Sequence, residues 1–351
     1  MRIGLTMTYA GGFRDTVAEL ADHEKSGAEV VYVPEAYSFD AVSQLGFIAA
    51  KTERMQIASG VLPIYTRTPS LLAMTAAGLD YVSEGRFTLG LGASGPQVVE
   101  GFHGVRYDAP LARTREVIEI CRTVWRREPI HHDGRYYQIP LPADNGTGLA
   151  KPLKLINHPV RQRIPIMLAA IGPKNVALAA EVADAWEPVF FLPERSGAVW
   201  DSALAEGAAH RDRRLPKLDV VAEAKLLITE DHHAVADALD NLRPKVALYV
   251  GGMGARNKNF YNDLFCRYGY EAAAKEIQDH YLDGRVKDAV AAVPDALLLA
   301  MSLIGPRSYV RERIAAYAAA GVTTLHLMPV ASDRCERVLQ IETVHAIAKV
   351  Y

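Results

Sequence analysis

The stretch MQIASGVLPIYTRTP, residues 55–69, begins as a buried strand and then departs from the strand pattern. Ser59 and Gly60 stand where a core strand usually carries branched side chains. A glycine inside a strand marks a bulge or a close approach by a ligand or another backbone. Pro63 ends the regular structure, and Thr68-Pro69 is typical of a helix start. These residues alone are equally compatible with a ligand-contacting bulge and with a plain strand that ends in a proline-rich loop.

On both sides of this stretch, short apolar runs alternate with segments of helical periodicity. Strand–helix alternation with short connections produces parallel βαβ units, so the pattern predicts an α/β protein, a single (β/α)8 TIM barrel. A doubly wound sheet is disfavoured because no GxGxxG turn follows the first strand. Eight strands are expected over residues 2–8, 30–33, 55–61, 86–92, 164–170, 184–187, 220–228 and 322–328. Helices are expected over 13–26, 40–53, 70–83, 110–127, 174–182, 194–211, a segment ending near 250, 271–282, 307–320 and 336–349.

Two insertions interrupt this alternation, at about 128–163 and 251–283. The first is rich in Pro, Gly, Asn and Asp, with a hairpin signal at Asp133-Gly134. The second opens with GGMGARNKNFYNDLFCRYGY, residues 251–270, which we expect to be irregular. Because no linker or internal repeat is apparent, the chain is expected to be one domain over residues 1–351.

Composition excludes several classes of function. The formal net charge of the 351 residues is -2, so no strong field attracts nucleic acid or an anionic membrane. The longest uncharged apolar run, residues 296–305, is too short to span a bilayer. The three cysteines are far apart and form no CxxC pair, which is typical of a reducing compartment. We expect a cytoplasmic protein that binds neither membrane nor nucleic acid.

In such a barrel the functional site lies at the C-terminal ends of the strands. The residues that follow the expected strands there are Thr8-Tyr9, Glu35-Ala36-Tyr37, Ser59-Gly60, Ser94-Gly95, Ile171 to Asn175, Glu187 and Met328. The sequence carries no HExxH, nucleophile elbow, P-loop, paired-carboxylate signature or clustered metal ligands, so no metal site is expected. A site with so little chemistry of its own predicts a bound cofactor that carries out the difficult step.

Ile171-Gly172-Pro173-Lys174-Asn175 is the best candidate for a phosphate site. Gly172 lets the backbone approach an anion, Pro173 suits a first helical turn, and the free amides there point outward with Lys174 beside them. A plain turn with a good helix start is the alternative. Ser94-Gly95 provides a second loop with exposed amides, and a flexible βα loop explains it equally well.

Glu35 follows the second strand and could hold a proton or accept a hydrogen bond from a ligand. A helix N-terminal charge or an ion pair at the barrel rim is the common alternative for a carboxylate in this position.

Six segments in the same order resemble the bacterial-luciferase-like superfamily, and specifically its branch that uses the deazaflavin coenzyme F420. The resemblance runs essentially from end to end of the chain. The segments are VPEAYSFDA (33–41), ASGVLPIYTRTP (58–69), GRFTLGLGASGPQVVEGFHG (85–104), RTREVIEICRTVWR (113–126), LAAIGPKNVALAAEVADAW (168–186) and LIGPRSYVRERIAAYAAAGVTT (303–324).

The resemblance implies a luciferase-like barrel, usually a homodimer, with the deazaflavin ring at the C-terminal end of the strands. It also implies a non-proline cis peptide under the ring, at Ser59–Gly60 or, in an alternative register, at Gly60–Val61. Gly172, Pro173, Lys174 and Asn175 would hold the cofactor phosphate, with help from Ser94 and Gly95.

Hydride transfer between coenzyme F420 and a small organic substrate is the chemistry that the resemblance implies. Glu35 would lie at the ring edge as the candidate catalytic residue, and we expect Tyr9 and Tyr37 near the substrate. Sugar-phosphate dehydrogenases of this branch carry a histidine after that acid. Ala36 stands there in this chain, which argues against sugar-phosphate oxidation.

Two alternatives remain open at this point. The same fold and phosphate loop would serve FMN in a luciferase-like monooxygenase. The sparse set of acids and bases also fits a non-catalytic flavin-binding barrel. A metal-dependent hydrolase is disfavoured, because the sequence has no cluster of His and Asp ligands.

Overall fold

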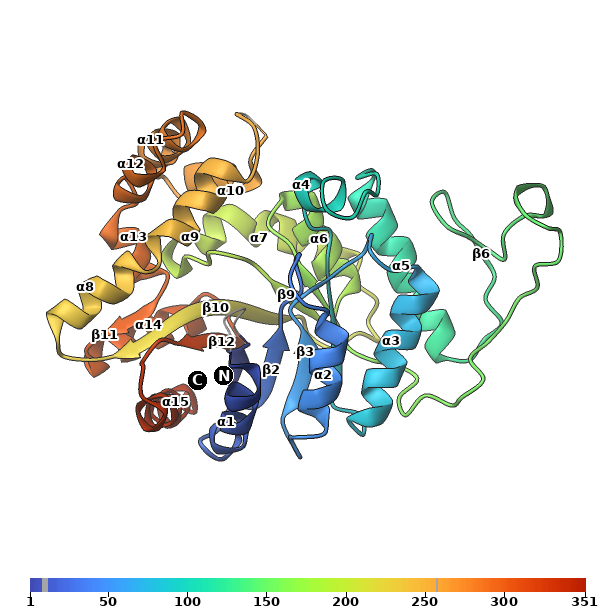
Figure 1. Ribbon diagram of the computed structural model, residues 1–351, viewed down its shortest axis with the longest axis horizontal. Helices are drawn as coiled ribbons and strands as arrows, with labels where there is room; N and C mark the ends of the chain where they lie inside the picture. The colour runs from blue at the N-terminus through green and yellow to red at the C-terminus, as the bar shows by residue number, and fades with distance from the viewer. Residues whose placement is uncertain (8–11, 257) are drawn as a thin grey trace.

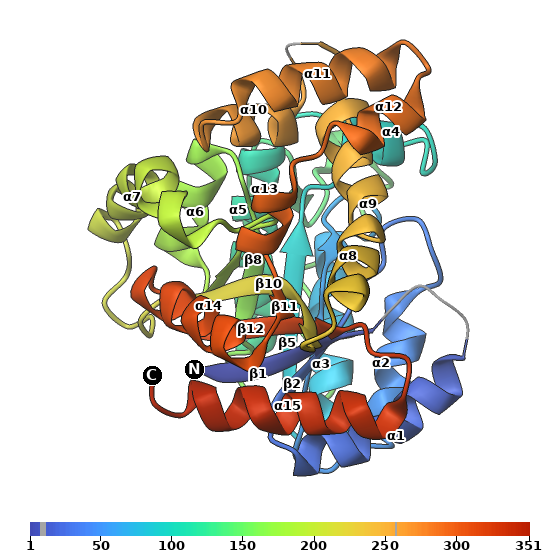
Figure 2. The ribbon, with the colours of Figure 1, turned by 90° about the vertical axis from the view of Figure 1, so that its left-hand side faces the viewer.

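The computed structural model describes residues 1–7, 12–256 and 258–351. Eight parallel strands form a closed ring. Figures 1 and 2 show the strands at the centre of the molecule with helices around them. The ring closes because β12 pairs with both β1 and β10, and β10 also pairs with β9. The predicted (β/α)8 barrel is therefore confirmed. Its strands are β1 (Arg2–Thr6), β2 (Val30–Val33), β3 (Gln56–Ser59), β5 (Phe87–Gly92), β8 (Ile166–Ala169), β9 (Ala185–Glu187), β10 (Asp219–Ile228) and β12 (Thr324–Pro329).

Helices cover the outside of the ring, and side chains at alternate strand positions decide which layer they join. Ile3, Val31 and Ile57 point outward into the main core beneath the helices. Tyr32 and Ala58 belong instead to a small cluster inside the barrel. The surrounding helices are α1 (Phe13–Lys25), α2 (Ala41–Ala49), α3 (Pro69–Val82), α5 (Pro110–Trp125), α6 (Pro173–Val182), α7 (Pro193–Ala209), α14 (Arg307–Ala319) and α15 (Arg334–Ala348).

Most helix starts coincide with the signals in the sequence. The Thr68 hydroxyl accepts a hydrogen bond from the Leu71 N–H at 3.2 Å, directly before Pro69 opens α3. Asp40 caps α2 in the same way through the Ser43 N–H, at 2.8 Å. Such caps satisfy backbone donors that the first helical turn leaves free.

The region between β10 and β12 differs from the prediction. The single helix expected to end near residue 250 is three pieces, α8 (His232–Asp240), α9 (Arg243–Ala247) and a π-helical turn η2 (Leu248–Gly252). The break falls where Pro244 removes a backbone donor from the helix. A strand that we did not predict, β11 (Leu303–Gly305), pairs with the end of β10. At three residues it is too short to show a period.

The stretch 251–270 is also more regular than expected. It contains α10 (Phe260–Arg267), whose start Asn259 caps by accepting from the N–H groups of Tyr261 and Asn262. Three more helices follow, α11 (Glu271–Leu282), α12 (Val286–Ala291) and α13 (Asp295–Ala300). Figure 2 shows α10, α11 and α12 together at the top of the molecule.

The stretch 128–163 carries little regular structure and extends away from the barrel in Figure 1. Its hairpin, β6 (His132–Asp133) with β7 (Gln138–Ile139), turns at the predicted Asp133-Gly134 signal. Its other short element is a 3-10 turn, η1 (Ala143–Asn145). In the part of the chain that the structure describes, no helix is long and apolar enough to cross a membrane. The assignment of one domain with two insertions stays a prediction.

Candidate functional site at the C-terminal end of the barrel

The third strand breaks where the sequence indicated, one residue later than our first choice. Ser59 still pairs with Val33 of β2, and the Gly60 N–H donates to the Val33 carbonyl at 2.9 Å. The cis peptide bond is Gly60–Val61, so the first choice, Ser59–Gly60, was wrong and the alternative register is correct. The reason is that the ladder to β2 holds the chain in extended form through Ser59. A short strand, β4 (Leu62–Pro63), then pairs with β5.

The Ser59 hydroxyl is hydrogen-bonded to the backbone of the neighbouring strand β5. Its hydroxyl accepts from the Gly90 N–H at 2.8 Å and donates to the Gly90 carbonyl at 2.9 Å, and the residue is fully buried. A Cβ at Gly90 would lie 1.8 Å from the Ser59 carbonyl oxygen, so only glycine fits there. Contact of Ser59 with a cofactor stays a prediction, and it would involve the backbone.

Gly60, directly after β3, and Gly92, at the end of β5, leave the space of a side chain to a neighbouring residue. A Cβ at Gly60 would lie 3.1 Å from the Tyr32 Cβ, and one at Gly92 would lie 2.7 Å from the Val61 Cγ2. Ala169 of β8 lies 3.7 Å from that same Gly92 position and contributes only a methyl group. Backbone left bare by glycine lets a ligand approach closely. We call Gly60, Gly92 and Ala169 the glycine surface, and contact of a flat ring with it stays a prediction.

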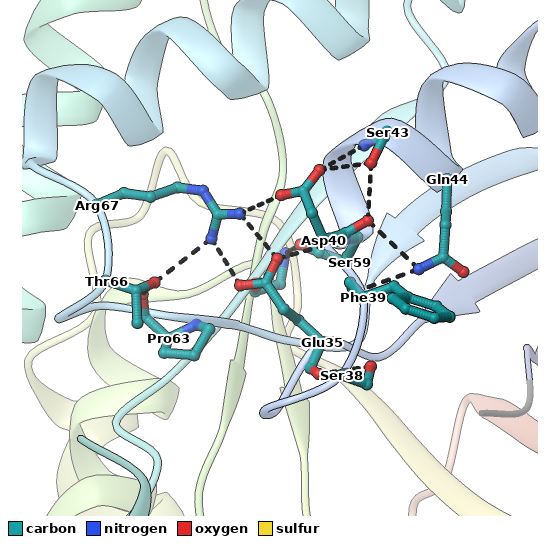
Figure 3. Close-up of polar contacts among 12 residues, drawn as sticks. Glu35, Ser38, Phe39, Asp40, Ser43, Gln44, Ser59, Pro63, Thr66 and Arg67 are labelled. Carbon is teal, nitrogen blue, oxygen red and sulfur yellow. Dashed lines mark hydrogen bonds and ion pairs between the residues drawn. The ribbon is translucent and has the colours of Figure 1, made fainter. Parts of the chain in front are cut away.

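Glu35 lies in an ion pair at the barrel rim, the alternative that the sequence left open. Arg67 donates to both Glu35 oxygens, at 2.7 and 2.8 Å, and to Asp40 at 2.7 Å (Figure 3). The Ala41 N–H at the start of α2 also donates to Glu35, at 3.0 Å. The hydrogen bond from Arg67 to Glu35 raises the pKa of the guanidinium above its ordinary value. With both oxygens bound, Glu35 could exchange a proton only after Arg67 moved, so its catalytic role stays a prediction.

Of the two tyrosines expected near the substrate, Tyr37 lies in the described part of the protein and Tyr9 does not. Tyr37 is 58% exposed, and its ring lies 6.2 Å from that of Phe102, which follows β5. Ala36, beside it, has a positive φ of 46°. Tyr9 lies outside the described residues. The position of Tyr37 beside the loop after β5 agrees with an expected place at the C-terminal end.

The candidate phosphate loop begins a helix, as expected. Gly172 is the N-cap of α6, Pro173 opens the helix, and no atom lies within 4 Å of the position of a Cβ at Gly172. Lys174 is exposed in the first turn. Free amides at the positive end of a helix dipole, with a lysine beside them, form a natural site for an anion.

Arg267 is a second cation at this loop, and the sequence analysis missed it. Its guanidinium donates to the Ile171 carbonyl at 3.1 Å and to the Val199 carbonyl at 3.3 Å. It comes from α10, a helix that we had expected to be irregular chain, so no sequence signal placed it here. Burial lowers the pKa of this guanidinium from its ordinary value.

Ser94 and Gly95 lie in the loop after β5. Ser94 is exposed and adopts a positive φ of 57°, and its carbonyl accepts from the Tyr107 hydroxyl at 3.5 Å. Gly95 is the N-cap of the short helix α4 (Pro96–Val99). The geometry leaves the Ser94 hydroxyl available, and the contact with a cofactor stays a prediction.

Beside the glycine surface, the interior of the barrel carries titratable side chains, of which only Glu187 was predicted to lie there; Glu187 of β9 pairs in register with Ala169 of β8. Glu187 Oε1 lies 2.6 Å from His326 Nδ1, and His326 Nε2 contacts the Thr6 hydroxyl. The Tyr32 ring packs on the imidazole with 4.0 Å between ring centroids. His326 alternates along β12 with outward-facing residues, and this period is the signal that could have placed it inside the barrel.

Strand β10 adds Glu223 and Lys225 to this part of the barrel, and α9 adds Lys245. Lys245 of α9 donates to Glu223 at 2.8 Å. Burial by itself raises the pKa of Glu223, but attraction to Lys245 and His326 outweighs it, so the pKa lies below its ordinary value. Burial lowers the pKa of the Lys225 ammonium below its ordinary value. This ammonium contacts Met328, which was predicted to lie at the rim of the barrel. This part of the barrel therefore holds the Lys245–Glu223 ion pair with Lys225 beside it. Across residues 1–7, 12–256 and 258–351, no group of metal-binding side chains is found.

The structure therefore defines the class of the protein as a closed (β/α)8 barrel with glycines at the end of the third and fourth ring strands, a helix start suited to an anion, and charged side chains inside the ring. Comparison with known proteins agrees with this class. The sequence pattern of the luciferase-like monooxygenase family matches residues 1–324, and the chain belongs to that family.

Relatives within the family are named for coenzyme F420. A provisionally named coenzyme F420-dependent oxidoreductase of Mycobacterium tuberculosis is 42% identical over 343 residues, which cover 96% of this chain and 97% of that protein. The 5,10-methylenetetrahydromethanopterin reductase of Archaeoglobus fulgidus is 28% identical over 86% of this chain and 85% of its own length. A solved coenzyme F420-dependent tetrahydromethanopterin reductase from Methanopyrus kandleri superposes with a TM-score of 0.79 at 21% identity, covering 99% of this chain and 98% of the other.

Proposed function

We propose that this protein is a coenzyme F420-dependent oxidoreductase that transfers a hydride between the deazaflavin and a small organic substrate. The observation that carries this proposal is the glycine surface at Gly60 and Gly92, within a chain that is 42% identical along nearly its whole length to a relative named for that cofactor. When bound, the deazaflavin would supply two-electron hydride chemistry, which no side chain of this protein can supply.

The residues present fit such a cofactor. The backbone at Gly60 and Gly92 would accept the face of the ring, because neither residue carries a side chain of its own. The amides at Gly172, Pro173, Lys174 and Asn175 would hold the phosphate, with the Lys174 ammonium beside it and Ser94-Gly95 nearby. Arg267 adds a charge at the same loop. Glu35 at the ring edge, with Tyr9 and Tyr37 near the substrate, completes the proposed site.

Binding of coenzyme F420 and of FMN to the purified protein, followed by fluorescence, tests this proposal. We expect F420 to bind at least about tenfold more tightly than FMN, which corresponds to about 1.4 kcal/mol. A preference for FMN, together with oxygen uptake by the reduced protein, would instead identify a monooxygenase. Binding of neither cofactor would contradict the proposal.

A Lys174→Ala variant separates the phosphate site from the ring site in the same assay. Loss of one charge-assisted contact should weaken binding of both phosphate-bearing cofactors by about tenfold. Lys51→Ala, at an exposed residue in the turn after α2, is the control. Equal affinities for Lys174→Ala and the control would place the phosphate elsewhere.

We also propose that the protein is a cytoplasmic homodimer that pairs through α3. Leu71, Met74, Tyr81 and Val82 form an exposed apolar stripe on that helix, opposite its buried face, and are 46%, 54%, 65% and 53% exposed. An apolar stripe of this extent supports contact with a second copy, because burying it in a partner removes it from water. The free thiols of Cys121, Cys266 and Cys335 suit a reducing compartment.

Light scattering is expected to give twice the chain mass of 38.4 kDa. The double variant Met74→Glu/Tyr81→Glu should give a folded monomer, because two charges cannot be buried unpaired at an interface. Leu339→Glu, at a residue 61% exposed on α15, is the matched control and should remain dimeric. A wild-type monomer, or a dimer that persists in the double variant, would contradict this assignment.

A further inference from the structure

Three side chains inside the barrel form one continuous chain of hydrogen bonds. They come from three different strands: Thr6 ends β1, Glu187 ends β9 and His326 lies within β12. Glu187 Oε1 is 2.6 Å from His326 Nδ1, and His326 Nε2 contacts Thr6 Oγ1. None of these three hydrogen-bonded residues belongs to the proposed cofactor site, and neither His326 nor Thr6 was expected to lie here.

The chemistry of these groups fixes the direction of the hydrogen bonds. A carboxylate only accepts, so the Nδ1 proton of His326 is donated to Glu187. Nε2 of the neutral imidazole is then an acceptor, and the Thr6 hydroxyl donates to it. The Thr6 oxygen still has lone pairs that can accept a proton from a bound molecule.

The exposed fraction differs among these three side chains in a way that favours a path for protons. His326 is 4% exposed, and the Glu187 side chain is 13% exposed. Thr6 is half-buried, and it is the last residue of β1, at the C-terminal end of the barrel. The hydroxyl of a half-buried residue is therefore backed by a buried base, which is backed in turn by a half-buried carboxylate, the order found in hydrolase triads.

The surroundings of His326 provide both rigidity and charge. The Tyr32 ring stacks on it from β2, and the Cβ position of Gly60 lies 3.1 Å from the Tyr32 Cβ, so the histidine is one side chain away from the glycine surface. Glu223 faces it from β10 in direct register. Lys245 is bound to Glu223, while Lys225 is two positions further along β10.

We propose that Thr6, His326 and Glu187 are the proton relay of the hydride-transfer reaction, and that the substrate is an alcohol or the corresponding carbonyl compound. This inference rests on the proposed function, because that function supplies the hydride acceptor. Thr6 is the catalytic residue that touches the substrate oxygen. His326 and Glu187 act through it.

In the oxidation direction, the bound deazaflavin would supply the two-electron hydride acceptor, and the alcohol C–O single bond would become the C=O double bond of the carbonyl product. The hydroxyl proton of the substrate passes to Thr6 Oγ1 as the Thr6 proton passes to His326 Nε2. The imidazolium that results is stabilised by the Glu187 carboxylate. Carbonyl reduction runs the same steps in reverse, with the imidazolium returning its proton through Thr6.

The test compares Thr6→Val, which keeps the side-chain shape, with Thr6→Ser, which keeps the hydroxyl. Each variant is loaded with coenzyme F420 and mixed with a panel of short primary and secondary alcohols. Loss of a positioned proton acceptor is expected to lower the rate of cofactor reduction about a hundredfold in Thr6→Val. Thr6→Ser should react within about threefold of the wild type, and both variants should bind F420 and melt as the wild type does.

Several outcomes would overturn the relay. If the three side chains only support the fold, Thr6→Val will melt at a lower temperature and react at the wild-type rate per folded molecule. Absence of reaction with every alcohol, in a protein that binds F420, would also overturn it.

The ring nitrogens give a test that needs no cofactor. Imidazole 15N spectra of the wild type should place the proton on Nδ1 of His326, with Nε2 free of a proton. Spectra that place it on Nε2 would overturn the relay. Failure of the wild type to bind F420, with the expected tautomer present, would count against the proposed function while the relay geometry stands.

Discussion

Replacing Gly60 by valine is expected to abolish binding of coenzyme F420 while the barrel remains folded. A Cβ at this position would lie 3.1 Å from the Tyr32 Cβ, closer than side chains normally approach. Tyr32 cannot move aside easily, because it is buried and packed against His326. The two further methyl groups of valine would stand above the surface where the ring is proposed to lie.

The measurement is the fluorescence titration with F420, in parallel with thermal unfolding. We expect the affinity of Gly60→Val to fall at least about a hundredfold, or about 2.7 kcal/mol, and that of Gly60→Ala to fall less. Gly46→Ala in α2 is the control, because nothing lies within 4 Å of the Cβ it would add. If Gly60→Val bound F420 like the wild type, the ring would have to lie somewhere other than on the glycine surface.

The barrel could be predicted from the sequence because the patterns that indicate it are local. Alternation between strand and helix periods, and glycine or proline at element ends, can be recognised within about 30 residues. The expected eight strands all occur, with ends shifted by one or two residues in most cases. Gly60 was identified for the same reason, since a glycine between buried strand positions is a local anomaly.

The partners of the site residues could not be predicted in this way. Thr6 and His326 are separated by 320 positions, and they meet only because β12 closes the ring against β1. Inward-facing positions can be assigned from the strand period, but the contacts between their side chains depend on the register of each strand pair. Glu35 shows the same limit, because Arg67 lies after the broken third strand, in a loop with no period at all.

Ser59 illustrates how a correct position can hide a different role. The sequence placed a small polar residue at the break in β3 and suggested ligand contact. In the structure its hydroxyl holds the backbone of Gly90, which replaces the ladder bonds that the break removes. A hydroxyl beside a glycine therefore indicates a close approach, but the approaching group can be another strand.

Replacing Arg67 by methionine is expected to lower the free energy of unfolding by about 3 kcal/mol, because it strands the buried Glu35 carboxylate. Glu35 is 7% exposed, and without Arg67 it would keep only the Ala41 N–H as a described partner. Urea unfolding of the variant measures the change. Arg126→Met, which breaks an exposed pair with Glu128, is the control and should leave the urea midpoint unchanged.

The double variant Arg67→Met/Glu35→Gln separates the effect of the ion pair on stability from its effect on the reaction rate. Removing both charges should recover part of the lost stability, since a neutral pair costs less to bury than one unpaired carboxylate. Glu35→Gln alone, assayed per folded molecule, then tests the catalytic prediction. A rate close to that of the wild type would leave Glu35 as the residue that holds Arg67, whereas a fall of about a hundredfold would assign it a proton. Single and double variants of equal stability would contradict the ion pair as the element that stabilises this rim.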